Sequence, residues 1–369
     1  MKKQRIVLAS VLKPVDDTRM FEKLGKSLSG NPNYDIFILG YPSKQPPADT
    51  KIILLPHTSF VRLSLQRVLT PLLILKKISK VRPDVLIVNT HELLIVAVLI
   101  RILFGSKIIY DVQENYWRNI LWTGAFPSLI KPLLAIWVRG KEVLLSRFFH
   151  LFFLAENGFE KEMKFFQNKS VVLENKSILP KGSVRTKSNG MIRLLFSGTI
   201  SASTGVFEAI DLVTILHQYD QSVRLHIIGY CSLPSTLNTV MFAIHDKPFI
   251  SLTGGNQLVP HREIITQIFN SDFGIIYYPS SPHTENRIPT KLYEYMSAQL
   301  PLLLQNYPPW VTLCDPYQAA IPIDLHAPID APALLQKMKL TDFYPVVPTG
   351  VDWSSEEEKL LESINKVLV

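Results

Sequence analysis

Short, continuously apolar runs alternating with helix-length segments are the feature that most constrains this chain of 369 residues. Strands that are apolar at consecutive positions, instead of at every second one, are typical of a parallel sheet covered by helices on both faces. The first half therefore predicts a doubly wound α/β domain. Its strands are expected at residues 5–10, 35–39, 51–54, 84–89, 107–110 and 151–154.

The same rhythm restarts after residues 180–190, which are rich in Pro, Gly, Ser and Lys and which we interpret as a surface linker. A chain of this length also favours two domains over one. We expect a first domain over 1–180, a second over 190–345 and a final helix over 350–369. In the second domain, strands are predicted at 193–196, 223–228, 250–252, 273–277 and 302–304, and helices at 206–219, 264–270 and 290–298.

Composition excludes several classes of protein. With 47% hydrophobic and 19% charged residues, the chain resembles a folded globular protein and not a disordered one. Cys231 and Cys314 stand far apart and form no zinc motif, which fits a reducing, cytoplasmic compartment. The first residues are interpreted as a strand and not as a signal peptide. The most apolar segment, Leu93–Phe104, contains Arg101 and is too short to span a bilayer.

Charge is distributed unevenly along the chain. Residues 1–180 contain 26 Lys and Arg against 14 Asp and Glu, whereas the remainder contains 13 against 17. The basic half indicates an anionic partner, which would be a phosphate-bearing acceptor, a membrane or a nucleic acid. The alternative is a basic surface that only keeps the protein soluble. Nucleic acid is disfavoured because no aromatic residues interleave with the cations in loops. Phe60–Lys80 and Leu129–Phe153 mix apolar and basic residues as interfacial helices do, although core-facing helices are the more frequent case.

Ligands of parallel α/β sheets bind beyond the carboxyl ends of the strands. After the first strand, Asp17 and Arg19 lie in a loop whose charges suit a phosphate or a sugar hydroxyl. Asp17 is equally suited to cap the following helix.

Two later strands of the first domain also end in polar residues. His91 and Glu92 follow the fourth strand, and Asp111 and Glu114 follow the fifth. Carboxylates beside buried strands are costly to desolvate without a partner, which makes them candidates for a site. His91 is as consistent with a purely structural role.

In the second domain, a loop of small residues from Gly198 to Gly205, including Thr199 and Thr204, joins a strand to a helix. Its backbone N–H groups and the helix behind them suit a diphosphate, although the loop is not a P-loop and could be only a tight turn. The segment Asn286–Met296 predicts a helix capped by Thr290.

This predicted helix brings three charged residues to one region. Lys291 and Glu294, at i and i+3, share a face, and Arg287 and Leu292 belong to the same motif. A cation and free amides suit a phosphate, whereas a carboxylate suits ribose hydroxyls. The alternative is a surface ion pair worth a few tenths of a kcal/mol.

Four motifs in this order resemble the GT-B glycosyltransferases, in particular the retaining enzymes of family four. They are Asp17-Thr18-Arg19, Tyr110 to Glu114, Gly198 to Gly205 and Pro289 to Met296.

The resemblance implies two Rossmann-like domains facing a cleft, with the C-terminal helix packed on the first domain. It implies a nucleotide diphosphate sugar as donor substrate, with no metal and no other cofactor. It places the donor on the second domain and the acceptor on the first. The implied residues are Gly198, Thr199, Thr204, Gly205, Arg287, Lys291, Leu292 and Glu294 for the donor, Asp17, Arg19, His91 and Glu92 for the acceptor, and Glu114, Asp111 and Lys291 for catalysis.

Three positions depart from the family pattern. Gln113 replaces a histidine that is a candidate catalytic group, Asn286 replaces the first glutamate of the helix motif, and Thr204 stands at a lysine position. We expect hexosyl transfer, with retention, to a glycan or lipid-linked acceptor, by a cytoplasmic protein in peripheral contact with a membrane. The alternatives are a weak or inactive GT-B protein that binds a sugar nucleotide or a partner glycosyltransferase, and a sugar-nucleotide epimerase.

Overall fold

The computed structural model describes residues 3–43, 47, 51–58, 60, 64–122, 126–166, 168–180, 185–186, 190–279, 287–325 and 327–368. The chain forms two compact units. The first comprises Met1–Asn175 with Trp353–Val369, and the second comprises Lys176–Asp352.

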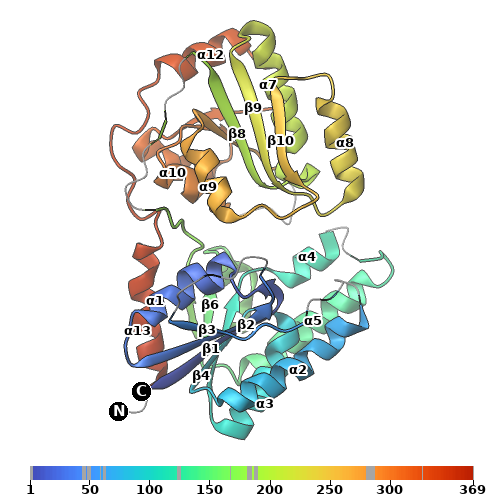
Figure 1. Ribbon diagram of the computed structural model, residues 1–369, viewed down its shortest axis with the longest axis vertical. Coiled ribbons are helices and arrows are strands. Elements are labelled where there is room, and N and C mark those ends of the chain that lie inside the picture. The colour runs from blue at the N-terminus through green and yellow to red at the C-terminus, as the bar shows by residue number, and fades with distance from the viewer. Residues whose placement is uncertain are drawn as a thin grey trace. The chain divides into compact units, whose positions relative to one another are not determined.

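The first unit is built on a parallel sheet of seven strands in the order β3-β2-β1-β4-β5-β6-β7, with helices on its faces (Figure 1). Val7, Leu86 and Ile108 of its central strands are fully buried, because helices cover both sides of the sheet. The strands are β1 (Gln4–Pro14), β2 (Tyr34–Tyr41), β3 (Ile52–Leu54), β4 (Val85–Val88), β5 (Lys107–Val112), β6 (Leu151–Leu154) and β7 (Ser170–Val172).

Among the described residues of this unit, six α-helices and three segments of π- or 3₁₀-helix connect these strands, and a last helix comes from the end of the chain. The six helices are α1 (Lys26–Ser29), α2 (Leu65–Val81), α3 (Leu94–Phe104), α4 (Tyr116–Trp122), α5 (Lys131–Ser146) and α6 (Phe159–Glu162). The other segments are a π-helical one at Thr18–Gly25 and 3₁₀ turns at His91–Leu93 and Lys164–Phe166, and the last helix is α13 (Ser354–Leu368).

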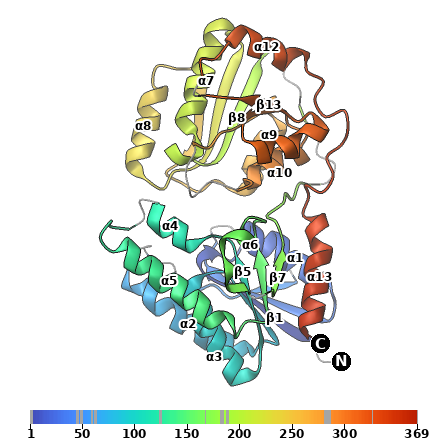
Figure 2. The same ribbon diagram turned by 180° about the vertical axis from the view of Figure 1, so that it is seen from behind.

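The C-terminal helix α13 belongs to the first unit. The Trp353 indole donates to the Ser27 hydroxyl at 2.9 Å, and the Tyr34 hydroxyl donates to the Asn365 side chain at 2.7 Å. Glu356, completely buried, accepts from the backbone N–H of Glu174. Both termini of the described chain therefore lie at this unit (Figure 2).

The second unit has a parallel sheet of six strands in the order β10-β9-β8-β11-β12-β13. Its strands are β8 (Ile192–Thr199), β9 (Val223–Tyr230), β10 (Ile250–Gly255), β11 (Phe273–Ile276), β12 (Leu302–Gln305) and β13 (Ala320–Ile323). Its helices are α7 (Val206–Tyr219), α8 (Pro234–Ile244), α9 (His261–Phe269), α10 (Thr290–Ser297), α11 (Pro308–Cys314) and α12 (Ala331–Leu340), with 3₁₀ turns at Ala202–Thr204 and Asp315–Tyr317.

The predicted α/β class with two parallel sheets is confirmed. All eleven predicted strands form, most of them one to four residues longer or shorter than expected. The prediction omitted strands β7 and β13 and helices α8, α11 and α12. Strand β7 has no fully buried residue, and β13 contains Pro322, so neither has the continuous apolar run by which the other strands were predicted. The predicted linker at 180–190 falls largely outside the described residues.

Candidate functional site

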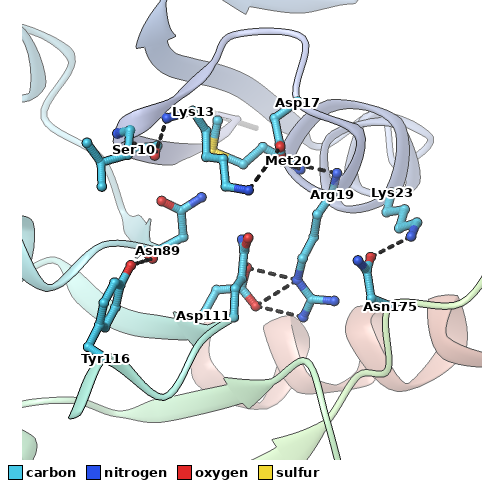
Figure 3. A network of polar contacts seen from close by, with 12 residues as sticks. Ser10, Lys13, Asp17, Arg19, Met20, Lys23, Asn89, Asp111, Tyr116 and Asn175 are labelled. Carbon is cyan, nitrogen blue, oxygen red and sulfur yellow. Dashed lines mark hydrogen bonds and ion pairs between the residues drawn. The ribbon is translucent and has the colours of Figure 1, made fainter. Parts of the chain in front are cut away.

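In the first unit, the side chains beyond strands β1 and β5 are joined by a buried ion pair. The Arg19 guanidinium contacts the Asp111 carboxylate through Nε, at 3.0 and 3.1 Å, and through Nη2, at 2.7 Å (Figure 3). Arg19 Nη1 donates to the Leu173 carbonyl at 2.9 Å. Both side chains are almost wholly buried, so each neutralises the other where water is excluded.

Gln113, at the position where the glycosyltransferases that the sequence resembles have a histidine, is a second hydrogen-bond donor to Asp111. Its amide Nε2 donates to Asp111 Oδ2 at 2.8 Å. The carboxylate thus accepts from two side chains in a fixed geometry. Glu114, one residue further on, accepts from the Asn119 amide at 2.8 Å and is only half-buried.

Asp17 caps the helical segment that follows β1, as the sequence allowed. Its Oδ1 accepts from the backbone N–H groups of Arg19 and Met20, both at 3.1 Å. Its Oδ2 lies 3.7 Å from the Lys13 ammonium. The negative charge of Asp17 raises the pKa of Lys13, and that of Glu114 does so to a smaller extent, whereas burial lowers it. The net effect is a raised pKa, so Lys13 stays charged at the strand end.

Asn89, at the end of β4, is a residue whose importance the sequence did not reveal. Its side chain is 4% exposed, and neither its Oδ1 nor its Nδ2 has a hydrogen-bond partner among the described residues. In Figure 3 its amide points toward the Lys13 ammonium, near Asp111. Leaving a buried polar group unpaired costs about 1–3 kcal/mol, which indicates a place for a hydrogen-bonding ligand or water.

His91 and Glu92 lie beside this edge in a partly buried cluster with two cations. Arg67 binds Glu92 Oε1 through Nε at 3.0 Å, and the Lys141 ammonium donates to His91 Nδ1 at 3.1 Å. Burial lowers the pKa of His91 to about 4, so its ring is neutral at pH 7. The Tyr116 ring meets the His91 ring edge-on at 4.7 Å.

In the second unit, glycines line the carboxyl ends of three adjacent strands. Gly198 of β8 pairs with Gly229 of β9, which pairs with Gly254 of β10. A Cβ at Gly229 would lie 1.6 Å from the Gly198 carbonyl oxygen, whereas a Cβ at Gly198 would meet nothing within 4 Å. At Gly198 the sheet therefore presents backbone and open space, whereas Gly229 lies close against the backbone of the neighbouring strand.

The loop from Gly198 to Gly205 is held by its own hydrogen bonds. Thr204, at the position where the resembled glycosyltransferases have a lysine, donates its hydroxyl to the Thr199 carbonyl at 2.7 Å and accepts from the backbone N–H of Ser201. Gly205 has φ +79°, and a Cβ there would lie 2.2 Å from the Tyr277 carbonyl oxygen. Only glycine fits this position, where helix α7 begins.

Helix α10 brings a buried lysine to the same loop. Lys291 Nζ donates to the Ser197 carbonyl at 3.1 Å and lies 4.4 Å from the centre of the Phe196 ring. One turn later, the Tyr295 hydroxyl is 2.7 Å from Ser197 Oγ. Burial lowers the pKa of Lys291 to about 8, so the side chain remains mostly charged at pH 7 but is poorly solvated.

Glu294 has a partner from another helix. Its Oε1 lies 2.7 Å from Nε2 of His261, the first residue of α9. This pairing could not be predicted from the sequence, because the two residues are 33 positions apart.

The start of helix α10 differs from the prediction. Thr290 does not cap the helix: Pro289, in extended backbone, takes the N-cap position and Thr290 is the first helical residue. Because proline fixes φ near −65°, the chain can turn directly into the helix after it. Asn286 lies outside the described residues. Arg287 accepts, through its carbonyl, from the Trp310 indole at 2.6 Å, and Leu292 is fully buried.

The proposed site residues thus fall into two groups, one at each sheet. In the first unit the structure brings Asp17, Arg19, Asp111, Gln113 and Glu114 to neighbouring strand ends. In the second, Lys291 lies against the Gly198 loop. The described residues contain no group of three or more His, Cys, Asp and Glu side chains able to hold a metal ion.

Comparison with known proteins identifies the fold. No protein-family model matches the sequence, and neither does any curated protein. Among solved structures, a sucrose-phosphate synthase from Thermosynechococcus elongatus is similar with a TM-score of 0.73 at 11% identity, covering 99% of both chains. HepE from Anabaena, in complex with UDP, is similar with a TM-score of 0.64 at 12% identity, covering 98% of this chain and 100% of the other.

A third structure, a trehalose 6-phosphate synthase from Burkholderia multivorans, has a TM-score of 0.58 at 11% identity, with 100% and 96% of the two chains covered. All three are GT-B glycosyltransferases. The chain therefore has the two-domain GT-B fold, as its motifs predicted.

Proposed function

We propose that the protein is a glycosyltransferase that moves a hexosyl unit, with retention, from a nucleotide diphosphate sugar to a glycan or lipid-linked acceptor. The observation that carries this proposal is Lys291, a buried cation that donates to the carbonyl of Ser197, the residue directly before the Gly198 loop. Burying an ammonium group without a carboxylate in contact costs desolvation free energy, unless a bound anion compensates for it. The diphosphate of a sugar nucleotide is such an anion.

In this proposal the second unit binds the donor. The Lys291 ammonium and the backbone N–H groups between Gly198 and Gly205 stabilise the negative charge that develops on the leaving diphosphate. Arg287 adds a second cation near the start of α10. Glu294, oriented by His261, accepts hydrogen bonds from the ribose hydroxyls. UDP is the first nucleotide to test, because HepE binds UDP and UDP-glucose.

The first unit supplies the acceptor side. Lys13 and the unpaired Asn89 amide offer a charge and hydrogen bonds to an acceptor hydroxyl or phosphate. Glu114 is the carboxylate proposed to contact the reacting groups. Arg19 and Asp111, originally candidates for direct contact, are positioning residues in this proposal because each is occupied by the other. His91 and Glu92 border the acceptor.

Ligand-dependent thermal stability tests the donor site. A nucleotide at 100 times its dissociation constant stabilises the protein by about 2.7 kcal/mol. We expect a rise in Tm with one of the UDP, GDP, ADP or TDP sugars, and loss of that rise in Glu294→Ala. The matched control is Glu263→Ala, which removes an exposed glutamate of α9 in the same unit. If none of the sugars raises Tm, the donor assignment is wrong.

One observation favours a second function, a GT-B protein that binds a sugar nucleotide without transferring the sugar. Gln113 and Thr204, at two positions where the family has a histidine and a lysine, are both engaged within the protein itself. Turnover of the nucleotide that raises Tm, with a panel of glycan and lipid-linked acceptors, separates the two functions. Turnover without an acceptor would instead indicate an epimerase.

A further inference from the structure

The first unit has a large exposed apolar surface. Of the exposed large apolar side chains described in this unit, all but Ile53 lie between Val68 and Leu144. Leu133 is 72% exposed and Trp137 61%. We use the name apolar face for the exposed residues on three helices: Val68, Leu69, Leu72 and Leu73 of α2, Ile95, Leu99, Ile102 and Leu103 of α3, and Leu133, Ile136, Trp137, Val143 and Leu144 of α5.

These three helices are neighbours. Helix α2 packs against α3, and α3 packs against α5. Both views show them side by side along the same side of the sheet (Figures 1 and 2). On each helix the exposed apolar residues recur at spacings of three and four, so each helix has one stripe turned outward while Ile74, Ala97 and Ala135 are buried. The apolar face therefore consists of adjacent stripes.

The second unit shows what an ordinary surface in this protein looks like. Its exposed apolar residues, such as Phe242 of α8 and Leu340 of α12, are distributed singly or in pairs over different elements. Scattered apolar residues need no explanation, whereas a contiguous patch marks an interaction surface.

Charge distinguishes among the partners that could cover the apolar face. The three helices contain eight Lys and Arg residues and a single carboxylate, Glu142, whose side chain is fully buried. Lys76 and Lys80 at one end of α2, and Arg147 after α5, are exposed. An apolar stripe bordered by Lys and Arg, with Trp at its edge, is the composition of helices that lie in the headgroup region of an anionic bilayer.

The helices are suited to lie on a bilayer and not to cross it. Helix α3, the most apolar, has 11 residues. Within the described parts of the chain, no helix has both the length and the apolarity to span a membrane.

We propose that the apolar face of α2, α3 and α5 docks on a lipid bilayer containing anionic phospholipids. The apolar side chains enter the boundary between headgroups and acyl chains, and the flanking cations contact lipid phosphates. This deepens the proposed function and rests on it for one consequence only: the acceptor is a lipid-linked glycan presented at the bilayer surface.

Vesicle co-sedimentation of the full chain tests the docking. We expect binding to vesicles of phosphatidylcholine with about 30% phosphatidylglycerol, and at least tenfold weaker binding to phosphatidylcholine alone. The triple variant Leu72→Gln, Leu133→Gln, Trp137→Gln should bind the anionic vesicles at least tenfold more weakly than the wild type. The matched control is Phe242→Gln, Leu340→Gln, Val346→Gln in the second unit, which removes equally exposed apolar residues and should bind as the wild type does.

A charge variant tests the electrostatic part. Lys76→Glu with Lys80→Glu should weaken binding to anionic vesicles and reduce its dependence on salt, whereas Lys337→Glu with Lys366→Glu should not. Undiminished vesicle binding by the triple variant overturns the proposal. The proposal is also overturned if the wild type does not bind vesicles but forms a concentration-dependent dimer, and the triple variant is a monomer. The partner of the apolar face is then a second copy of the chain.

The test is independent of the donor site. The rise in Tm with a sugar nucleotide reports the second unit, and vesicle binding reports the first. A protein that binds vesicles but no nucleotide would contradict only the proposed function, and one that binds a nucleotide but no vesicles would contradict only the docking.

Discussion

The strand ends of the two units are built in opposite ways. In the first unit they carry large charged side chains that pair with each other, as Arg19 and Asp111 do. In the second they carry glycines, and the buried cation Lys291, near the start of α10, contacts a backbone carbonyl. An edge of paired side chains is rigid and specific in shape, whereas an edge of backbone and open space admits a polyanion. In the proposed function, the first edge faces the acceptor and the second binds the donor.

Breaking the Arg19–Asp111 pair should have the largest effect. Arg19→Met leaves the Asp111 carboxylate buried and without its main partner, so the free energy of unfolding should fall by about 3–5 kcal/mol. Urea denaturation measures the change. Lys26→Met, which removes an exposed partner of Glu22, should cost less than about 1 kcal/mol.

The double variant Arg19→Met, Asp111→Leu tests whether the loss of stability comes from an unpaired buried charge. Because it leaves no unpaired charge, it should recover most of the lost stability. Equal losses in the single and double variants would show that the pair is not what organises this edge.

Filling the glycine edge should come next. Gly205→Ala places a methyl group about 2.2 Å from the Tyr277 carbonyl oxygen at a φ of +79°, and should cost about 2–4 kcal/mol of unfolding free energy. Gly198→Ala, with a φ of +97° and nothing within 4 Å, should cost about 1 kcal/mol. Isothermal titration should show that Gly198→Ala nevertheless weakens nucleotide binding, because its methyl group occupies the space proposed for the diphosphate. An unchanged nucleotide affinity would show that the diphosphate does not bind beside Gly198.

Lys291 should show a conflict between stability and binding. Its pKa in the folded protein is about 8, against about 10.4 in an unfolded chain. The unfolded state therefore binds more protons between these values, and stability should rise as pH increases from 8 to 10. Lys291→Met should abolish that rise.

At pH 7 the same variant should be more stable by about 1–2 kcal/mol, because the desolvation cost exceeds the lost hydrogen bond to Ser197. Nucleotide affinity should fall at least tenfold, and wild-type affinity should decline above pH 8. Thermal unfolding and titration across pH 6–10 measure both; a Lys291→Met protein that is less stable at every pH would contradict the prediction.

The smallest effect is expected at Gln113. Gln113→Leu removes one hydrogen bond to Asp111 and should cost about 1 kcal/mol. Gln113→His keeps a ring N–H able to donate to the carboxylate, so its stability should stay within about 0.5 kcal/mol of the wild type. Chemical denaturation of both variants compares their free energies of unfolding. A Gln113→Leu protein as stable as the wild type would show that Asp111 needs no hydrogen-bond donor besides Arg19.

The sequence predicted much of the fold because secondary structure in a doubly wound sheet depends on local pattern. Val206–Tyr219 was predicted as a helix with both ends correct, and the carboxyl ends of β1, β4, β5 and β8 were found closely enough to locate the polar loops. Strands β7 and β13 were missed, because β7 is only half-buried and β13 is interrupted by Pro322. Asp17 as a helix cap was also readable, since its partners are two and three residues away.

What the sequence determined by itself is therefore the alternation of strands and helices and the two parallel sheets, which follow from hydrophobic periodicity, and the order of the motifs, which follows from residue identity. The tertiary structure decided which charges meet: Arg19 with Asp111, 92 residues apart, and His261 with Glu294. It also decided that Lys291 is buried, that Asn89 has no partner among the described residues, and that the apolar stripes of α2, α3 and α5 face outward. Pairing, burial and exposure depend on what long-range folding places around a side chain, and periodicity contains no such information.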